Sequence, residues 1–490
     1  MLDSVVPTAR VRTLNDRVPD PNGAHVLYWM TSARRTTFNF ALERAVEWAC
    51  ELGRGLVVLE ALRCDYEWAS DRFHRFVLDG MADNALDARG REGLAWYPFV
   101  EPNPGAGKGL LAELAATAAV VVTDDYPTFF IPDMLSAAAD RVTVRFEAVD
   151  SNGLAPMRGT PRSFPSAYTF RRYLQKSLPD YLGQTPETDP LERLKGIAAP
   201  VIPVSILDRW PSADSALSEG GPDLASLPLD HSVGPVGLRG GTRAAGLRLQ
   251  EFLRYRLSEY ADERNHPDED AASGLSPYLH FGHISVHEIL VRLAEREEWT
   301  PAFEDRPTNG KRTGWWGMSP SAEAFVDQVV TWRELGFNMA ANRPDHREYE
   351  SLPEWARETL EAHAGDARPS LYNLEELQAA ATHDELWNAA QRQLLGEGII
   401  HNYLRMLWGK KILEWTAGPR EAAAVMIELN NRFAIDGRDP NSYSGIYWCL
   451  GRYDRPWGPE RPVFGKIRYM TSRNTARKLR LKEYLERYGD

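Results

Sequence analysis

The stretch HVLYWMTSARRTTFNFALERAVEWACELGRGLVVLEALR, residues 25–63, decides the fold of the first part of the chain. It begins and ends with short apolar runs, His25–Met30 and Leu56–Arg63, while Thr37–Leu52 between them has helical periodicity. A strand, a helix and a second strand in close succession are typical of a βαβ unit, whose two strands run parallel. The stretch therefore predicts the start of a parallel sheet.

The same alternation continues to residue 150. Strands that are nearly continuous in apolar residues indicate a parallel sheet covered by helices on both faces. Ligands of such sheets gather at the carboxyl ends of the strands. We therefore predict an N-terminal, Rossmann-like α/β domain. Its further strands are predicted at Leu94–Glu101, Val120–Tyr126 and Val142–Asp150, and its further helices at Tyr66–Ala88, Gly109–Ala118 and Pro132–Ala139.

The chain changes character after this domain. Residues 198–241 are rich in Pro, Gly, Ser and Asp and show little periodicity, which is typical of a linker. From residue 242 onward strand signals almost vanish and helical runs dominate. We predict an α/β domain at 1–197, an inter-domain linker at 198–241 and an all-α domain at 242–490. The length of 490 residues agrees, because it exceeds one ordinary core.

Composition excludes several classes of protein. The contents of 43% hydrophobic and 26% charged residues are those of a soluble globular chain. The longest apolar stretch, Leu110–Val122, is too short to span a membrane. The three cysteines, Cys50, Cys64 and Cys449, lack CxxC spacing. We therefore expect neither a disulfide framework nor a metal site, and a cytoplasmic location.

The distribution of charge matters more than its sum. The net charge of −12 argues against a nucleic-acid partner. Residues 452–482, however, carry ten Lys or Arg and only two acids, with Trp and Tyr interleaved. This composition favours a surface that follows phosphates, and the alternative is an ordinary solvated face.

A polar stripe on an otherwise apolar helix is the densest chemical signal. Asn402, Arg405, Met406 and Gly409 follow the i, i+3, i+4, i+7 spacing of one helix face. A buried arginine needs a carboxylate partner. The stripe therefore predicts an Arg–carboxylate pair with a second segment.

The segment LNNRFAIDGRDPN, residues 429–441, offers that partner. Asp436 and Asp439 lie in a Gly/Pro-bent loop, with Asn430 just before it. Amide and carboxylate groups in such a loop are able to surround a flat heterocycle. The alternative is a structural Arg–Asp pair between two helices.

Two further signals lie in the same half of the chain. Ser276 precedes Pro277, as an N-cap precedes an N1 proline, and free amides at that helix start would take a pyrophosphate. A plain capped helix is the alternative. Trp408 and Trp415 are seven residues apart on one helix, with Trp387 upstream. Such tryptophans either pack in the core or carry electrons to a redox cofactor.

Together these segments resemble class II cyclobutane pyrimidine dimer photolyases of the cryptochrome/photolyase family. The resemblance covers nearly the whole chain. Five matches in the right order make it specific and favour the functional interpretation of each signal above. They are LSPYLHFGHIS, THDELWNAAQ, LRMLWGKKILEWT, LNNRFAIDGRDPNSY and ERPVFGKIRYM, beginning at residues 275, 382, 404, 429 and 460.

The resemblance implies a C-terminal helical domain that holds a U-shaped FAD. Arg405 paired with Asp436, together with Asp439, would hold the isoalloxazine, and Asn430 would face its N5. Trp408 and Trp387 would form the photoreduction chain, with Trp415 close by. The residues that would line the phosphate and adenine side are Tyr260, Ser273, Leu275, Ser276 and Pro277.

The activity that the resemblance implies is light-driven repair of pyrimidine dimers in DNA. Excited FADH⁻ would pass an electron to the dimer, whose ring splits before the electron returns. The dimer would first be flipped out of the duplex, because a stacked base cannot reach a buried flavin. The residues that would touch the lesion or fill its gap are Asn265, Trp332, Met406, Trp448, Arg455, Trp457 and Arg468.

Two positions depart from the family pattern. Gln328 stands where the family usually has a glutamate that hydrogen-bonds the dimer; an amide still donates but carries no charge. Asn402 stands where class II members often have glycine. Photolyases for the (6-4) lesion would be expected to have a histidine at the position of Met406, so that lesion is disfavoured as the substrate.

Two other functions compete with repair. A cryptochrome-like receptor would bind FAD and signal without repair, and Gln328 is its best support. An FAD-dependent dark oxidoreductase would need a nicotinamide site, but no G-x-G-x-x-G follows any predicted strand. In the family the first domain tolerates deazaflavin, folate or no antenna pigment, and the sequence does not decide among them. We expect a monomer.

Overall fold

The computed structural model describes residues 5–303 and 306–489, which form two compact units. Each unit is assembled from segments that are distant in the sequence. The N-terminal unit comprises Met1–Thr160, Leu178–Leu249 and Leu275–Arg292, and the C-terminal unit comprises Pro161–Ser177, Gln250–Gly274 and Leu293–Asp490. The domain boundaries that we placed at 197 and 241 stay a prediction, since these units interleave along the chain.

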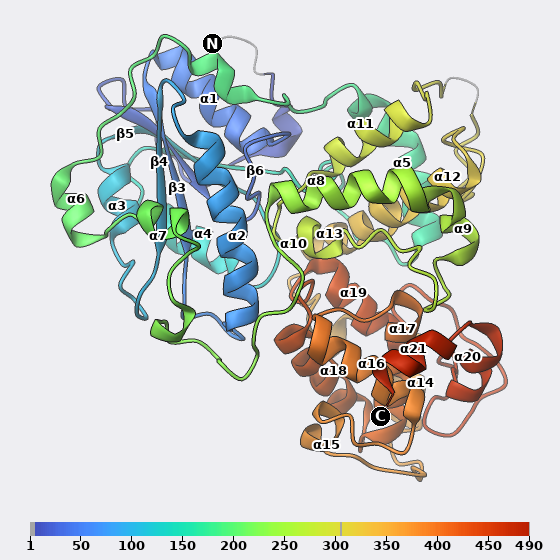
Figure 1. Cartoon of the computed structure of the whole chain (residues 1–490). Coiled ribbons are helices and arrows are strands. Elements are labelled where there is room, and N and C mark those ends of the chain that lie inside the picture. The colour runs from blue at the N-terminus through green and yellow to red at the C-terminus, as the bar shows by residue number, and fades with distance from the viewer. Residues whose placement is uncertain (1–4, 304–305, 490) are drawn as a thin grey trace. The chain divides into compact units, whose positions relative to one another are not determined.

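The N-terminal unit is built on a six-stranded sheet in the order β1-β6-β5-β2-β3-β4 (Figure 1). Five strands are mutually parallel, as predicted, but β1 (Val11–Thr13) pairs antiparallel with β6. This edge strand was not predicted, because a strand of three residues is too short to show a pattern. The parallel strands are β2 (His25–Met30), β3 (Gly55–Leu62), β4 (Leu94–Val100), β5 (Ala118–Asp124) and β6 (Arg145–Val149).

Helices follow these strands in the predicted alternation. α1 (Phe40–Leu52) contacts β2 and β3, and α2 (Asp71–Ala88) contacts β3 and β4. α3 (Leu110–Ala115) contacts β5 and β2, and α4 (Ile131–Ala139) joins β5 to β6. Right-handed crossovers place the helices that lead toward the β4 edge of the sheet on one face, and the helices that lead toward β6 on the other. The sheet is therefore doubly wound.

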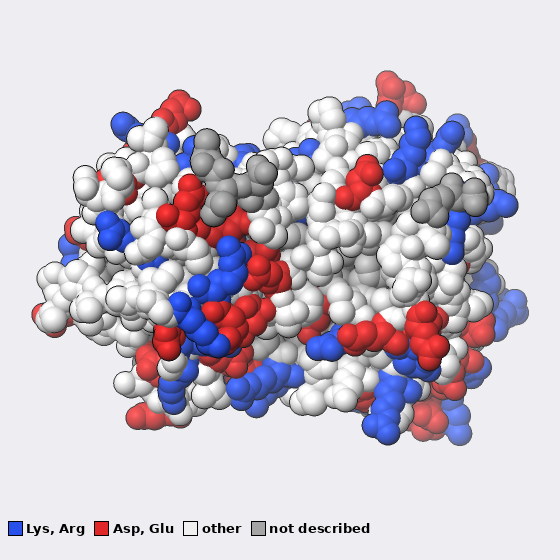
Figure 2. All heavy atoms as spheres, turned by 90° about the horizontal axis from the view of Figure 1, so that it is seen from above, with Lys and Arg blue, Asp and Glu red and all other residues white. Residues whose placement is uncertain are grey.

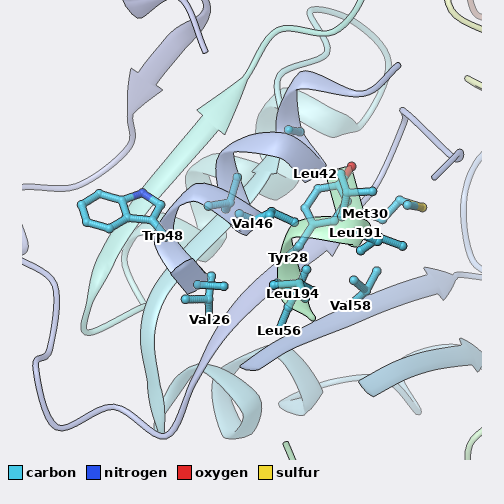
Figure 3. Close-up of a cluster of buried hydrophobic side chains, with 14 of the residues drawn as sticks. Val26, Tyr28, Met30, Leu42, Val46, Trp48, Leu56, Val58, Leu191 and Leu194 are labelled. Atoms are coloured by element: carbon cyan, nitrogen blue, oxygen red, sulfur yellow. The ribbon is translucent and has the colours of Figure 1, made fainter. Parts of the chain in front are cut away.

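The core of this unit lies where α1 covers the sheet (Figure 3). Alternate residues of β2 and β3 point to the same face, which is the period of a strand. They meet apolar side chains of α1 and of the 3-10 helix η2 (Pro190–Leu194). The labelled members are Val26, Tyr28, Met30, Leu42, Val46, Trp48, Leu56, Val58, Leu191 and Leu194.

An aspartate occupies the point where the strand order reverses, between β2 and β5. Asp124, at the end of β5, accepts hydrogen bonds from the main-chain amides of Thr31, Ser32 and Ala33 at 2.7, 2.7 and 3.0 Å. Its other oxygen accepts from the Tyr28 hydroxyl at 2.7 Å. In a dinucleotide-binding sheet, such amides after the first parallel strand would face a pyrophosphate. Here a carboxylate of the protein itself takes them.

The named elements of the rest of the described chain are helices joined by turns and irregular segments. The segment predicted as a linker contains α6 (Val204–Arg209), α7 (Asp214–Ser218) and the 3-10 helix η3 (Leu224–Ser226). α5 (Ala167–Leu182), α8 (Thr242–Glu251) and α11 (Val286–Arg296) contain residues of both units, and α10 (Ser276–His280) belongs to the N-terminal one.

The C-terminal unit is helical, as predicted, and α17 lies against three of its helices. α17 (Asn402–Trp415) contacts α16 (Glu385–Glu397), α18 (Pro419–Phe433) and α19 (Pro440–Cys449). Within the described ranges, no helix combines the length and the apolar character that crossing a membrane requires. The other helices are α9 (Tyr260–Glu263), α12 (Pro320–Val326), α13 (Arg333–Asn342), α14 (Glu354–Ala362), α15 (Leu374–Gln378), α20 (Ser472–Lys478) and α21 (Lys482–Tyr488).

Replacing Asp124 by alanine is expected to destabilise the N-terminal unit by about 3 kcal/mol, since three amides, two of them buried, and a buried hydroxyl lose their acceptor. The measurement is the midpoint of urea unfolding followed by far-UV circular dichroism. Asp140→Ala, at an exposed position after α4, serves as the control and should leave the midpoint unchanged. An Asp124→Ala midpoint equal to that of the unmodified protein would show that the carboxylate does not hold this turn.

Candidate functional site

Arg405 and Asp436 form the predicted ion pair, between α17 and the loop after α18. Arg405 Nη2 donates to Asp436 Oδ1 at 2.9 Å, and the side chains are 23% and 13% exposed, so the pair lines a surface. Arg405 Nε is buried and has no hydrogen-bond partner among the described residues. A purely structural Arg–Asp pair would use the guanidinium fork in full. This one leaves a donor for a ligand.

The loop that carries Asp436 has a rigid bend. At Gly437 a Cβ would lie 2.8 Å from the main-chain oxygen of Asn430, so only glycine fits. Arg438 takes a φ of 64°, and its buried guanidinium donates to main-chain oxygens of the same segment. Asp439 ends the loop as the N-cap of α19, accepting from the Asn441 amide at 2.8 Å. At least one of its oxygens therefore serves the helix.

The Asn430 side chain is held in one orientation. It is 2% exposed, and its Nδ2 donates to Ser442 Oγ at 2.6 Å. Its neighbour Asn431 accepts from the Arg438 amide at 2.9 Å and donates to the Tyr443 hydroxyl at 3.1 Å. Both asparagines thus tie the end of α18 to the loop and to α19.

Three buried tryptophans form a continuous chain. The rings of Trp408 and Trp387 are parallel, with centroids 6.5 Å apart, and Trp387 meets Trp415 edge to face at 5.6 Å. The Trp387 indole donates to the main-chain oxygen of Trp408 at 3.0 Å, and the Trp408 indole donates to Gln391 Oε1 at 2.8 Å. Trp387 thus bridges the two tryptophans that lie seven residues apart on α17.

The chain of rings continues toward solvent. The Tyr372 ring lies 5.4 Å from Trp415, and its hydroxyl is 2.6 Å from Nδ1 of the exposed His383. Lys411 Nζ lies 5.3 Å from the Trp415 ring centroid. Sequence reasoning missed Tyr372, because it lies on a loop before α15 and no spacing relates it to Trp415.

Four of the predicted lesion-contact residues are brought together at the end of α19 and in the segment that follows it. The Arg468 guanidinium lies 4.1 Å from the Trp457 ring and 5.5 Å from the Trp448 ring, and Arg455 lies 4.6 Å from Trp457. We call these four residues, with Asp454, the Trp448–Arg468 cluster. Trp448 and Trp457 are both partly exposed, as rings that receive a flat ligand must be.

Asp454 organises this cluster, and sequence reasoning missed it. It accepts from Arg468 Nε at 2.8 Å and Nη2 at 3.0 Å, and from the Trp457 indole at 3.1 Å. Burial alone would raise the pKa of Asp454, but the hydrogen bonds and charge of Arg468 outweigh it, so the pKa is lowered. The carboxylate therefore stays ionised and holds both side chains.

Gln328 and Trp332 lie on a π-helical segment, η6 (Asp327–Trp332), between α12 and α13. They are four residues apart, which brings them to one face of a π-helix, and both are partly exposed while the residues between them are buried. Asp327 is turned away, since both its oxygens bind the buried Arg171, at 2.7 and 3.1 Å. Asp327 therefore cannot act in place of the glutamate that the family usually has at position 328.

The predicted phosphate side needs one correction. The N-cap of α10 is Leu275 and not Ser276, because the Leu275 carbonyl accepts the first helical hydrogen bond, from the Leu279 amide at 2.9 Å, and no side-chain cap is made. Ser276 and Pro277 are the first two helical residues. They belong with Leu275 to the N-terminal unit, whereas Tyr260 and Ser273 belong to the C-terminal one.

Two more predicted residues lie on different elements of the C-terminal unit. Asn265 lies in the turn after α9, and Met406 lies beside Arg405 on α17. Both are partly exposed. Met406 also receives a contact at its main-chain oxygen, from the Cys449 thiol at 3.8 Å. Tyr260 is buried against Phe252 and Phe325.

The basic segment 452–482 is only partly available to a partner. Arg452 is buried and binds the main-chain oxygen of His346, so it is structural. Arg480, Lys466 and Lys482 pair with carboxylates, as Arg468 does. On the face seen in Figure 2, acidic and basic residues are likewise interspersed. The segment's exposed members without an ion pair among the described residues are Arg455, Arg461, Arg473, Arg477 and Lys478.

Sequence comparison places these features in a known family. The chain is 33% identical to a deoxyribodipyrimidine photo-lyase of Methanothermobacter thermautotrophicus, over 99% of this chain and 98% of that one. The chain belongs to the photolyase/cryptochrome family. A deoxyribodipyrimidine photo-lyase of Potorous tridactylus is 33% identical over 97% of this chain and 83% of its own length. Another, of Oryza sativa subsp. japonica, is 32% identical over 97% of this chain and 90% of its own length. No family model matches.

The fold agrees with that of the family. A class III photolyase from Agrobacterium tumefaciens superposes with a TM-score of 0.66 over 95% of this chain and 86% of that one, at 17% identity. The predicted architecture, a Rossmann-like α/β part followed by a helical part, is thereby confirmed. The prediction of a photolyase-type enzyme is confirmed at the level of the family by the named relatives. Members of this family carry a flavin-type chromophore, and the unused Arg405 donor fits one.

Proposed function

We propose that the protein uses light to repair cyclobutane pyrimidine dimers in DNA, with FAD as cofactor, in the manner of class II photolyases. The observation that carries the proposal is the arrangement around α17. One helix bears the Arg405–Asp436 pair with its spare donor and the start of the tryptophan chain, and it packs against α19, which ends in the Trp448–Arg468 cluster. Cofactor, electron supply and lesion would each find matching chemistry there.

Each group of residues would then hold, orient or reduce the cofactor. Bound FAD, once reduced, supplies the electron that light sends to the dimer. Arg405, Asp436 and Asp439 would hold the isoalloxazine, and the fixed Asn430 would face its N5. Tyr260, Ser273, Leu275, Ser276 and Pro277 stay predictions for the phosphate and adenine side. Trp408, Trp387 and Trp415 would resupply electrons from outside.

The remaining residues would act on DNA that contains pyrimidine dimers. A dimer must leave the duplex before it reaches a buried cofactor, and damaged bases cost least to extrude. Trp448 and Trp457 would pack on the extruded lesion, with Trp332 and Gln328 on η6 as a further contact. Four further residues would complete the lesion site or fill the gap that the extruded dimer leaves in the duplex: Arg455, Arg468, Asn265 and Met406. The exposed arginines of 452–482 would bind phosphates.

Two observations weigh against the competing functions. A dark oxidoreductase would need a nicotinamide nucleotide, and the amides that such a nucleotide would use in the N-terminal sheet are bound by Asp124. A signalling receptor has no need of the Trp448–Arg468 cluster, which this chain retains. A monomer, a cytoplasmic location and a deazaflavin or folate antenna stay predictions.

The deciding experiment is repair by the reduced protein. Purified protein is reduced, mixed with an oligonucleotide that contains one thymine dimer, and illuminated with blue light. Loss of the dimer, measured by chromatography of the digested strand, is expected in the light sample and not in the dark one. Dimers that persist while the flavin photoreduces normally would instead favour the receptor.

Trp408→Phe is expected to slow photoreduction of the bound flavin, because it removes the first ring of the tryptophan chain. Repair by chemically prereduced protein should stay close to that of the unmodified protein. Flavin absorbance under blue light and the dimer assay measure the two effects. Trp299→Phe, at a tryptophan that contacts Trp316 instead, is the matched control. Loss of both properties in Trp408→Phe would make this ring structural.

Gln328→Glu is expected to raise the repair yield, because a carboxyl group restores the charge and proton sharing that an amide lacks. The yield per absorbed photon is measured with prereduced protein. Gln250→Glu, at an exposed position of α8, makes the same chemical change away from η6 and should have no effect. A lower yield in Gln328→Glu would place the glutamine away from the dimer.

A further inference from the structure

Lys410 is a buried cation behind the Trp448 ring. It lies on α17, five residues after Arg405, and its side chain is fully buried. Its Nζ donates to the main-chain oxygen of Cys449 at 2.6 Å and lies 5.1 Å from the Trp448 ring centroid. The side chain therefore reaches from the cofactor helix to the far end of α19, where the Trp448–Arg468 cluster begins.

No carboxylate pairs with this ammonium group within the described part of the chain, where the nearest polar partner is a carbonyl oxygen. The next residue is a useful contrast, since Lys411 binds Glu414 Oε2 at 2.7 Å and lies 3.9 Å from Asp384. An unpaired buried charge is costly, and a protein that needed only packing here would place a methionine or leucine. The cost indicates that the charge has a use.

The groups around Lys410 leave its charge largely uncompensated. Asp454, the acid that acts on it, already binds Arg468 through both oxygens, so that pair is close to neutral. Arg468 adds a like charge on the same ring. Burial raises the pKa of the Cys449 thiol to about 11, so the thiol stays neutral. The Trp448 ring thus lies in a positive local field.

We propose that Lys410 is a positioning residue for the repair reaction, which fixes Trp448 and places a preorganised positive charge behind the ring on which the dimer packs. The inference rests on the proposed function. An electron that arrives on the dimer makes it an anion, and a fixed cation in a water-poor site stabilises that charge without having to reorganise. The electron returns after the ring splits, so no net oxidation occurs and Lys410 gives up no proton.

Protonation of Lys410 gives the inference a pH signature. Burial lowers the pKa of this lysine from its usual value to about 8, against which Cys449 and Asp454 act to raise it and Arg468 to lower it further. The group is therefore charged at neutral pH and loses its charge as the pH rises through about 8. A repair yield that depends on the charge should fall over the same interval.

The test compares Lys410→Met, Lys410→Arg and the control Lys311→Met, at an exposed position of the same unit, as prereduced holoproteins. Lys410→Met should lower the repair yield per photon roughly tenfold at neutral pH, a charge effect across a few ångströms. Lys410→Arg should keep the yield and make it independent of pH, since a guanidinium does not deprotonate. Lys311→Met should repair like the unmodified protein.

Two readouts do not depend on turnover. The chain has nine lysines, so ¹³C-labelled lysine spectra should show one Cε resonance that titrates near pH 8 and disappears in Lys410→Met. Binding of dimer-containing DNA in the dark, measured by fluorescence anisotropy, should weaken less than the yield falls. A Cε resonance that titrates at an ordinary lysine value would overturn the inference.

The possible failures are distinguishable. If the unmodified protein repairs dimers but Lys410→Met matches it, or the unmodified protein's yield is flat through pH 8, this inference fails alone. If the unmodified protein does not repair at all, the proposed function fails. Should Lys410→Met not retain flavin, the pH dependence of the unmodified protein against that of Lys410→Arg still decides.

Discussion

The ion pair between Arg405 and Asp436 joins α17 to the bent loop after α18, and the arrangement of the site depends on this joint. A half-buried arginine cannot stay unpaired, so the pair sets how α17 lies against that loop. Successive residues of a helix turn by about 100°, which puts Trp408 and Lys410 on roughly opposite sides of α17. One side therefore carries the tryptophan chain and the other reaches the Trp448–Arg468 cluster.

The local arrangement of charged side chains in this protein differs in sign from its net charge. The net charge is −12, yet Lys410 and Arg468 lie against Trp448 and Arg455 lies against Trp457, with the carboxylate of Asp454 bound to Arg468. A polyanionic partner responds to such a local field, because salt screens charges that lie beyond about 10 Å. The same field would favour an electron on the bound lesion.

The N-terminal unit illustrates why fold alone does not give function. Its sheet reverses strand order as dinucleotide-binding sheets do, but the amides at the reversal point are taken by Asp124. A carboxylate of the chain acts there as a ligand would and stabilises the turn between β2 and α1. The chemistry of the protein is accordingly expected in the helical unit, around α17.

The sequence by itself determined the elements and the residues that are close along one helix. Strand and helix periodicities are local, so β2 was predicted to the residue and the Arg405 stripe was placed on one helix. The five motifs were enough to identify the family. The three-residue β1 and the cap of α10 were missed or misplaced, because neither has a pattern long enough to read.

Only the tertiary structure decided which distant residues meet. Trp387 bridges Trp408 and Trp415, Asp327 is taken by Arg171, and Lys410 lies under Trp448. Each of these contacts joins separate helices, and no spacing within a single segment encodes it. Whether a buried side chain finds a partner for its charge likewise depends on which helices cover it. The sequence alone therefore does not distinguish Lys410 from the ion-paired Lys411 beside it.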